Sequence, residues 1–447
     1  MLPSVFGIDS DIFFLIIMKN RVDFLLSRME QLSKETIFLG LDRIERLLVG
    51  LGSPQAHLKI IHVAGTNGKG SCIAFLEAIF LAQGYRVASY VSPHLQYFNE
   101  RIRLQGRGIS DAQLVAYLER VLRVNSEQCA TFFELTTAAA LACFADWQPD
   151  WVLLETGLGG RLDATNAVSP KLCLINNIDL DHQELLGTTL AQIAMEKGGI
   201  LKSGVPAAAD PGSREAEGVL MAQAQRLKVP LWLKGQEYDY IIQSDGLWRY
   251  RDALGELTLK APSLAGTHQF GNAALAVAGI RLLQRQGVLL SELAIQTGLT
   301  NTFWPGRLHC FLGPPCLLLD GAHNPAAARR LAQFLREMIL TNGVRPEEIF
   351  LIFSAFRDKD IVGMIHHLAP VVGSVWVVPL PQPRGSPTFE LARLWEAMGR
   401  PVVVCSHVEQ ALHQTRARCP KMGCIVVTGS LHLVGDVYSL LHKEKID

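Results

Sequence analysis

The sequence predicts an α/β protein with mostly parallel sheets, arranged in more than one folded unit. Short apolar segments of strand length alternate with segments of helical periodicity along most of the chain, which is typical of parallel sheets covered by helices. The pattern restarts after Trp304-Pro305-Gly306. A length of 447 residues exceeds one ordinary domain, and a hydrophobic fraction of 49% supplies the cores of two or three.

The first half contains a strand, a glycine-rich turn and a helix, followed by further strands. Strands are expected over 59–64, 86–91, 151–155 and 172–176. The first helix is expected over 71–83, because Gly84 is a natural helix stop. Residues 231–260 differ, since alternating segments at 238–243 and 248–259 predict a small antiparallel appendage.

The second half repeats the pattern with its own strands. These are expected over 316–320, 349–353, 374–378, 401–405 and 423–427. We therefore place a boundary near 300–306, which divides the chain into an extension (1–17), a first domain (18–303) and a second domain (304–447). The proline-rich segment 379–387 is interpreted as a loop inside the second domain.

The N-terminal segment Ile12–Met18 is apolar but does not resemble a secretory signal. Asp9 and Asp11 precede it in place of basic residues, and Lys19 follows it in place of a small-residue cleavage site. We interpret residues 1–17 as an extension and Met18 as a plausible initiator.

Composition excludes several functional classes. Lys+Arg and Asp+Glu both count 42, so the formal charge is zero, which argues against nucleic acid or an anionic membrane as a partner. No apolar stretch reaches the ~18 residues that span a bilayer. The nine cysteines are odd in number and form no C-x-x-C pair, so neither a disulfide framework nor a zinc site is indicated, and we expect a cytoplasmic protein.

A glycine-rich loop at the first strand–helix junction is the clearest motif. It consists of Gly65, Thr66, Asn67, Gly68, Lys69, Gly70 and Ser71. Glycines let backbone N–H groups turn inward, the helix N-terminus adds positive potential, and Lys69 can reach terminal phosphates. Gly70 stands where a strict Walker motif has Ser or Thr. A tight strand-to-helix turn without a ligand is the alternative.

The loop and a series of other motifs resemble the folylpolyglutamate synthase/dihydrofolate synthase family of the Mur ligase superfamily. The resemblance runs from Ser33 to Val434. Its motifs are TIFLGL (36–41), SPHL (92–95), FNER (98–101), LETGLGGRLDATN (154–166), Asp181-His182, Glu196-Lys197, His268-Gln269, WPGRL (304–308), DGAHNP (320–325) and TGS (428–430). It implies an N-terminal P-loop-type ATPase domain with the antiparallel appendage and a C-terminal Rossmann-like domain.

Three residues follow strands at positions suited to a hard cation. Glu155 ends an apolar strand as a Walker-B acid does, Ser92 follows a second strand, and His182 follows a third. Taken singly, a capping carboxylate, a turn serine and a structural histidine are the plainer interpretations. The resemblance implies that they hold magnesium, with two sites expected, and leaves potassium as a further possibility.

The resemblance also assigns catalytic and nucleotide-binding roles. Lys197, otherwise a solvated helix lysine, matches a carbamylated lysine of the family, a modification that requires a depressed pKa. Lys69 and His323 complete the catalytic set, although a capping role for His323 is the alternative. Beyond the glycine loop, the residues expected to contact ATP are Asn272, Arg307 and Asp320.

A further set matches the pterin-binding positions of the bifunctional members. It contains Thr36, Thr131, Phe132, Phe133, Glu134, Leu162, Asp163 and Ala164. Aromatic faces can stack on a heterocycle and carboxylates can accept from its N–H groups, whereas core packing is the alternative for Phe132 and Phe133. Because the chain keeps Arg-Leu-Asp-Ala-Thr-Asn at 161–166, we expect both activities.

The expected function is an ATP-dependent ligase that joins L-glutamate to a carboxylate through an acyl phosphate. Dihydropteroate would give dihydrofolate, and tetrahydrofolate would gain further glutamates. Three alternatives are polyglutamylation alone, a Mur-type ligase acting on a UDP-sugar peptide, and a regulatory protein that senses ATP. The phosphate loop begins at residue 65, which leaves little room for a separate UDP-binding domain. The resemblance favours a monomer.

Overall fold

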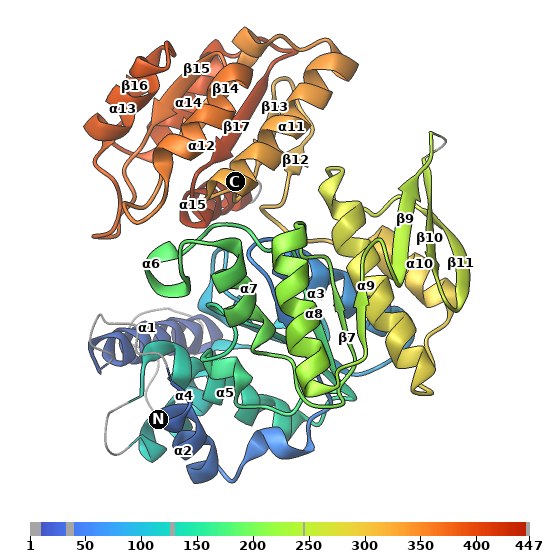
Figure 1. Ribbon diagram of the computed structural model, residues 1–447. Helices are drawn as coiled ribbons and strands as arrows, with labels where there is room; N and C mark the ends of the chain where they lie inside the picture. Colours follow the sequence, from blue (N-terminus) through green and yellow to red (C-terminus); the bar gives the residue numbers. More distant parts are fainter. Residues whose placement is uncertain (1–9, 33–39, 126–129, 245, 444–447) are drawn as a thin grey trace.

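Two α/β units with separate sheets make up the molecule (Figure 1). The structure is a computed structural model that describes residues 10–32, 40–125, 130–244 and 246–443. The second unit lies at the top of the view and the first below it, with a small third sheet at the right. This arrangement confirms the predicted fold class.

The first unit is built on an eight-stranded sheet that is mostly parallel. In spatial order its strands are β4 (Arg107–Gly108), β3 (Ile102–Leu104), β2 (Val87–Tyr90), β5 (Trp151–Glu155), β1 (Ile60–Ala64), β6 (Leu172–Ile175), β7 (Ala207–Ala209) and β8 (Leu231–Leu233). Only the β2–β3 and β3–β4 pairs are antiparallel. Every residue of β1 and β5 is buried, as expected for parallel strands covered on both faces.

Helices cover both faces of this sheet. One core contains side chains of α3 (Lys69–Ala82), α9 (His268–Arg285) and α10 (Glu292–Asn301). The opposite core contains those of α1 (Ser10–Leu32), α2 (Asp42–Gly50), α4 (Asp111–Val124) and α5 (Phe132–Trp147). A third group, α7 (Leu190–Gly198) and α8 (Arg214–Leu227), packs on β6 and β7, and α6 (Gln183–Leu186) precedes it.

The small third sheet is antiparallel, as predicted, but it spans residues 238–260 and not 231–260, because Leu231–Leu233 form β8, which pairs in parallel with β7 in the first sheet. Its strands are β9 (Tyr238–Ile242), β10 (Leu247–Asp252) and β11 (Gly255–Lys260). Trp248 and Tyr250 are buried whereas Arg249 and Arg251 are exposed, which is the alternation of a half-covered strand. The buried face joins the core that contains α9.

The second unit has a six-stranded sheet. In spatial order its strands are β12 (His309–Phe311), β13 (Cys316–Leu319), β17 (Cys424–Thr428), β14 (Ile349–Phe353), β15 (Ser374–Val377) and β16 (Val402–Val404). Helices α11 (Pro325–Asn342), α12 (Ile361–Leu368) and α13 (Thr388–Ala397) cover one face. Helices α14 (Val408–Arg418) and α15 (Leu431–Lys443) cover the other. The edge strand β12 is antiparallel to β13.

Short 3₁₀ turns complete the secondary structure. They are η1 (Pro54–His57), η2 (Phe98–Arg101), η3 (Ala164–Asn166), η4 (Pro346–Glu348) and η5 (Ala369–Val371).

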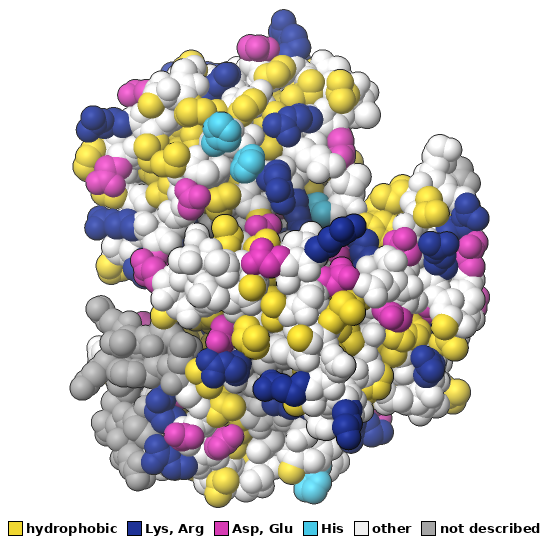
Figure 2. Space-filling model, viewed as in Figure 1, with side chains coloured by type: hydrophobic (Ala, Val, Ile, Leu, Met, Phe, Trp, Pro, Cys, Tyr) yellow, Lys and Arg dark blue, Asp and Glu magenta, His cyan; other side chains and the backbone are white. Residues whose placement is uncertain are grey.

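Helix α1 passes through the position interpreted as the initiator. It spans Ser10–Leu32, so Met18 lies inside the helix; the interpretation of 1–17 as an extension stays a prediction. Within the described ranges, no helix combines the length and apolarity of a bilayer-spanning segment. Figure 2 shows acidic and basic side chains interspersed over the face in view, in keeping with the zero formal charge.

A buried ion pair fixes the small sheet to helix α9. Nε of Arg281 lies 3.1 Å from Oδ2 of Asp252, and their side chains are 8% and 0% exposed. We expect Asp252→Ala to lower the free energy of unfolding by about 3 kcal/mol, because Arg281 is left buried and unpaired. Urea unfolding of the two proteins measures the difference.

The matched control is Asp239→Ala on the same sheet. Asp239 lies 3.9 Å from Arg251, and these side chains are 36% and 66% exposed. Asp239→Ala should therefore change the free energy of unfolding by no more than about 0.5 kcal/mol. Equal losses in the two variants would contradict the role assigned to the buried pair.

Candidate active site between the two sheets

The glycine-rich loop joins β1 to α3 at the carboxyl edge of the first sheet. Gly65 has φ 151°, and a Cβ there would lie 2.8 Å from Cβ of Asn176. Gly68 is the N-cap of α3 with φ 82°, and a Cβ there would collide with the side-chain amides of Asn176 and Asn272. Both positions therefore require glycine, because of the backbone conformation and because of the space.

The segment after β6 holds this loop in place. The backbone N–H of Thr66 donates to the carbonyl oxygen of Asn177 at 2.8 Å, and the N–H of Asn67 donates to Oδ1 of Asn177 at 3.0 Å. Oγ1 of Thr66 donates to the carbonyl oxygen of Asp179 and accepts from its N–H, at 3.1 and 3.0 Å. The loop is thus preorganised by hydrogen bonds within the first unit.

Two lysines from different helices donate to one carbonyl of the loop. Nζ of Lys69 lies 3.1 Å and Nζ of Lys197 lies 2.9 Å from the carbonyl oxygen of Gly65. Burial, together with the charge of Lys69, lowers the pKa of Lys197 to about 7. A large fraction of Lys197 is therefore the neutral amine near pH 7, which is the form that reacts with electrophiles.

Glycines after Lys197 allow α7 to pack closely against its neighbours. A methyl group at Gly198 would collide with the side chain of Gln223 on α8, and one at Gly199 would meet the backbone of Arg161. Gln223 is buried and donates from Nε2 to the carbonyl oxygen of Met195 at 3.0 Å. Gly198 and Gly199 thus each have a packing reason, and the end of α7 that carries Lys197 is held from both sides.

The three predicted metal ligands line the same cavity as the loop. Ser92, Glu155 and His182 face it together with Lys69 and Lys197. Glu155 accepts a 3.0 Å hydrogen bond at Oε2 from the N–H of Ser92, and burial raises the pKa of Glu155 while Lys69 opposes the shift. A carboxylate and a hydroxyl beside a phosphate-type loop are oxygen donors that fit Mg²⁺, and a cation there would favour the charged form of Glu155.

His182 is held in an unusual conformation by the second unit. Its φ is 50°, and its Nε2 lies 3.3 Å from Nζ of Lys359, which also donates to Oδ1 of Asp181 at 2.9 Å. Burial opposes ionisation of Asp181, but Lys359 outweighs it and the pKa of Asp181 is lowered. A metal bound at His182 Nε2 would therefore compete with Lys359, a residue that the sequence analysis did not select.

Reciprocal asparagine hydrogen bonds also connect the two units. Asn67 and Asn324 exchange side-chain hydrogen bonds of 3.3 and 3.2 Å, and Nδ2 of Asn324 donates to Oδ2 of Asp181 at 2.8 Å. His323 lines the cavity beside them and contacts the carbonyl oxygen of Gly321 through Nδ1 at 2.9 Å. Burial, followed by the charge of Lys359, lowers the pKa of His323 to about 4, so its imidazole is neutral at pH 7.

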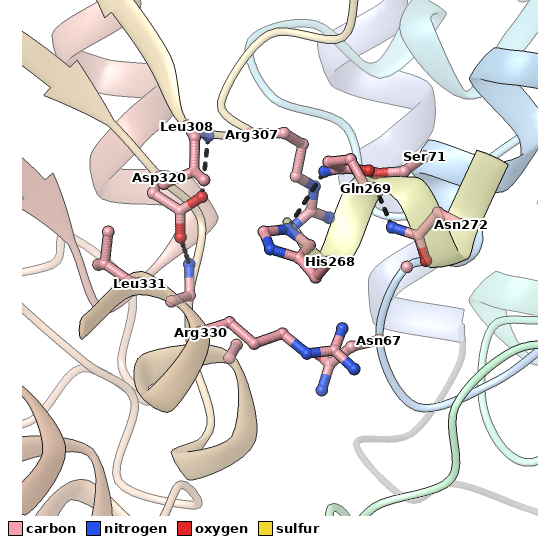
Figure 3. Close-up of a pocket in the computed structure, with 13 residues that line it drawn as sticks. Asn67, Ser71, His268, Gln269, Asn272, Arg307, Leu308, Asp320, Arg330 and Leu331 are labelled. Atoms are coloured by element: carbon pink, nitrogen blue, oxygen red, sulfur yellow. Dashed lines mark hydrogen bonds between the residues drawn. The ribbon is translucent and has the colours of Figure 1, made fainter. Parts of the chain in front are cut away.

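A second cavity lies between the glycine loop and helix α11 (Figure 3). The three predicted ATP contacts outside the loop, Asn272, Arg307 and Asp320, all line it. Asp320 accepts from the N–H groups of Leu308 at 2.9 Å and Ala322 at 3.0 Å. Figure 3 shows Arg307 and Asp320 on the second-unit side and the α9 residues on the other.

The sequence analysis assigned no role to some residues of this cavity. His268 and Gln269, named there only as a motif, and Arg330 also line it. Gln269 accepts at Oε1 from Nδ2 of Asn272 at 2.8 Å, and their i, i+3 spacing on α9 was a signal that could have placed them together. Arg330, on α11, carried no comparable signal.

Comparison with known proteins identifies the family. Residues 306–431 match the family described as Mur ligase, glutamate ligase domain. A dihydrofolate synthase/folylpolyglutamate synthase of Bacillus subtilis (strain 168) is 32% identical over 420 residues, or 89% of this chain and 94% of the relative. The chain belongs to the dihydrofolate synthase/folylpolyglutamate synthase family. The resemblance inferred from the motifs is confirmed.

Solved structures of the family share the whole fold. E. coli FolC in complex with DHPP and ADP is similar with a TM-score of 0.87 and 33% identity, over 95% of this chain and 98% of that one. A bifunctional folylpolyglutamate synthase/dihydrofolate synthase with Mn, AMPPNP and L-glutamate bound is similar with a TM-score of 0.83 and 34% identity, over 94% and 98%.

The described residues of the set predicted to bind the pterin lie outside both cavities. Thr36 is outside the described residues; the remaining seven are described and are not among those that line either cavity. Glu134 forms a capping box with Thr131 at the start of α5 and an ion pair of 3.1 Å with Arg43. Both of its oxygens are thus engaged within the protein, and its predicted contact with a pterin stays a prediction.

Two other members of that set, Phe133 and Asp163, support the loop over 157–166. Asp163 accepts from the N–H groups of Leu158 at 2.7 Å and Thr165 at 3.0 Å. Phe133 lies under Gly157, where an added Cβ would collide with its ring. Leu162 is half-buried and Ala164 is buried. Phe132 packs edge-on against Phe98, with ring centroids 5.8 Å apart.

We expect Gly68→Ala to destabilise the protein more than a glycine substitution at the other end of α3. Both Gly68 and Gly84 have left-handed φ values, 82° and 91°, but only Gly84 faces open space. Backbone strain alone should lower the free energy of unfolding of Gly84→Ala by about 1–2 kcal/mol. Gly68→Ala should lower it by about 2 kcal/mol more, because the side chains of Asn176 and Asn272 must move. Urea unfolding measures both, and equal losses would contradict the steric argument.

Proposed function

We propose that this chain is an ATP-dependent ligase that joins L-glutamate to dihydropteroate, giving dihydrofolate, and adds further glutamates to tetrahydrofolate. The observation that carries the proposal is the convergence of the glycine loop with Arg307 and Asp320 on one cavity and with Glu155, Lys197 and His323 on an adjoining one. This places a phosphate cradle next to a carboxylate, an amine and an imidazole. The family supports the choice of substrates.

The reaction proceeds in two steps. An oxygen of the substrate carboxylate attacks the γ-phosphorus of ATP, the bond to the ADP oxygen breaks, and an acyl phosphate forms. The amine nitrogen of L-glutamate then attacks the acyl carbon, phosphate leaves, and the amine gives up a proton as the amide forms. Both steps concentrate negative charge near the transferred phosphoryl group, so fixed positive groups lower their barriers.

Residues of the two cavities match these demands. Lys69 and the loop N–H groups stabilise charge on the phosphoryl oxygens. Arg307 reaches the same region from the second unit, and Asp320 holds the Arg307–Leu308 segment through its bond to the N–H of Leu308. His323, neutral at pH 7 because its pKa is about 4, is suited to orient the attacking amine by a hydrogen bond, whereas so low a pKa makes it a weak proton acceptor.

Ser92, Glu155 and His182 are the residues that would hold magnesium. The bound cation would polarise the phosphoryl oxygens as a Lewis acid. The number of two magnesium sites is a proposal carried by the resemblance. The further use of potassium is a proposal carried by the resemblance.

The remaining proposals concern organisation and setting. We propose that the chain divides into a first domain over 18–303 and a second over 304–447, because each sheet has its own cores. We also propose that it acts as a monomer in the cytoplasm on small molecules. Balanced charge supports the absence of a nucleic-acid or membrane partner.

The deciding experiment is phosphate release from the purified protein with MgATP and L-glutamate, with dihydropteroate and tetrahydrofolate in separate reactions. Turnover with both acceptors is expected. Turnover with tetrahydrofolate alone would reduce the proposal to polyglutamylation, and no turnover with either would overturn it.

Lys69→Ala should lower turnover in this assay by at least about 10³-fold, because a fixed charge at the phosphoryl group is lost. The control Lys260→Ala removes an exposed lysine of β11 and should leave turnover unchanged. Thermal unfolding of both variants verifies that the fold is intact. Near-normal turnover of Lys69→Ala would contradict the role of this lysine.

We further propose that Lys197 is carbamylated: its neutral amine adds to carbon dioxide and releases one proton, leaving a carboxylate. The protein supplied with ¹³C-bicarbonate should show a carbamate carbon signal by NMR. Because the pKa of Lys197 is about 7, the amine becomes charged as the pH falls below this value, and the signal should then disappear.

Lys197→Ala should remove the carbamate signal at every pH. Lys202→Ala is the matched control, since burial also lowers the pKa of Lys202, and it should retain the signal. A signal that persists in Lys197→Ala, or one that is lost only in Lys202→Ala, would refute the assignment.

A further inference from the structure

Four cysteines gather at the edge of the second sheet that is opposite the candidate site. Cys310 lies on β12, Cys316 and Cys424 begin β13 and β17, and Cys419 follows α14. Cys316 is directly paired with Cys424 in the parallel ladder. The candidate site lies past the other end of β13, where Asp320 follows Leu319. The cluster is therefore separate from the proposed chemistry.

Within this cluster, Cys310 and Cys316 are in direct contact. Their Sγ atoms lie 2.9 Å apart. Cys310 is paired with Leu318 across the β12–β13 hairpin, so Cys316, two residues from Leu318, is its diagonal neighbour on the same face. The hairpin itself thus brings these two sulfur atoms together.

The two thiols are also accessible. Cys310 is exposed and Cys316 is partly exposed, whereas Cys419 and Cys424 are buried. Cys310 and Cys316 line a cleft of about 490 Å³ with side chains of α11, among them Phe334 and Met338. A small molecule can therefore reach the contacting pair, and its first contact is with Cys310.

We propose that Cys310 and Cys316 are a site of reversible disulfide formation that clips the edge strand β12 to β13. The oxidant is a low-molecular-weight disulfide such as glutathione disulfide. The number and spacing of the cysteines in the sequence did not indicate this disulfide site; only the structure shows that these two cysteines are in contact.

The exchange balances in two steps. The thiolate of Cys310 attacks one sulfur of the small disulfide, forming a mixed disulfide and releasing one small thiolate. The thiolate of Cys316 then attacks the Cys310 sulfur and releases the second. Two protein thiols are oxidised, one small disulfide is reduced, and the two protons pass to the released thiolates. A hydrogen bond with Cys316 and partial burial raise the pKa of Cys310, so the exchange is slow at neutral pH.

The proposed disulfide would restrain the β12–β13 hairpin, which leads to the candidate site. β12 directly follows Arg307 and Leu308, and β13 leads into Asp320, which accepts from the N–H of Leu308. The disulfide closes the short segment 310–316 and removes conformations from the unfolded chain. The oxidised protein should therefore unfold at a higher temperature than the reduced one.

The test uses the full-length protein incubated with glutathione disulfide at pH 8.5, after which free thiols are blocked and the protein is analysed by intact mass and peptide mapping. The expected result is the loss of two hydrogen atoms, a single crosslink between Cys310 and Cys316, and a raised unfolding temperature. Dithiothreitol should reverse all three.

Two variants separate the proposal from other pairings. Cys310→Ser should abolish the crosslink and the temperature shift, and Cys424→Ser should retain both. If Cys424→Ser does not fold, the peptide map of the unsubstituted protein still identifies the pair. A crosslink to Cys419 or Cys424, a stable glutathione adduct at Cys310, or unreacted thiols at both positions would each overturn the proposal. None of these readouts depends on ligase activity.

Discussion

The rest of the candidate site depends on one carbonyl oxygen, that of Gly65. It accepts a hydrogen bond from Lys69 of α3 and another from Lys197 of α7, so two amino groups are held side by side in a buried place. Their mutual repulsion and the low local dielectric favour proton loss from one of them. Burial and the charge of Lys69 lower the pKa of Lys197 to about 7, so the shared acceptor places a readily deprotonated amine of α7 next to the lysine of the glycine loop.

Polar contacts connect the two units. The Asn67–Asn324 pair and the contacts of Lys359 with Asp181 and His182 cross the boundary, while the hydrophobic cores of the two sheets remain largely separate. Contacts of this kind exchange with water at small net cost, which suits an interface that opens to admit substrates and closes for chemistry. The same groups would have to rearrange when a cation binds at His182.

Most of the architecture was predictable from the sequence, because strands buried on both faces consist of consecutive apolar residues that are easily recognised. The core strands β1, β5, β6 and β14 lie where expected, whereas β3, β4, β7, β8 and β12 are two or three residues long and too short for a periodic signal. The glycine loop and the cavity residues were predictable from their motifs. Lys359 and Arg330 were not, since their positions follow from how the second unit docks. Nor did sequence show that Glu134 is engaged by Thr131 and Arg43.

The contact between Gly198 and Gln223 has a consequence for how this chain can change over time. The amide of Gln223 fills the space that a methyl group at 198 would need. The side-chain volumes at these two positions, on α7 and α8, are therefore coupled. An alanine at 198 requires the Gln223 amide to turn away or a smaller side chain to replace it, and a smaller side chain at 223 beside Gly198 leaves a void next to the helix that carries Lys197. Substitutions at the two positions are therefore expected to occur together.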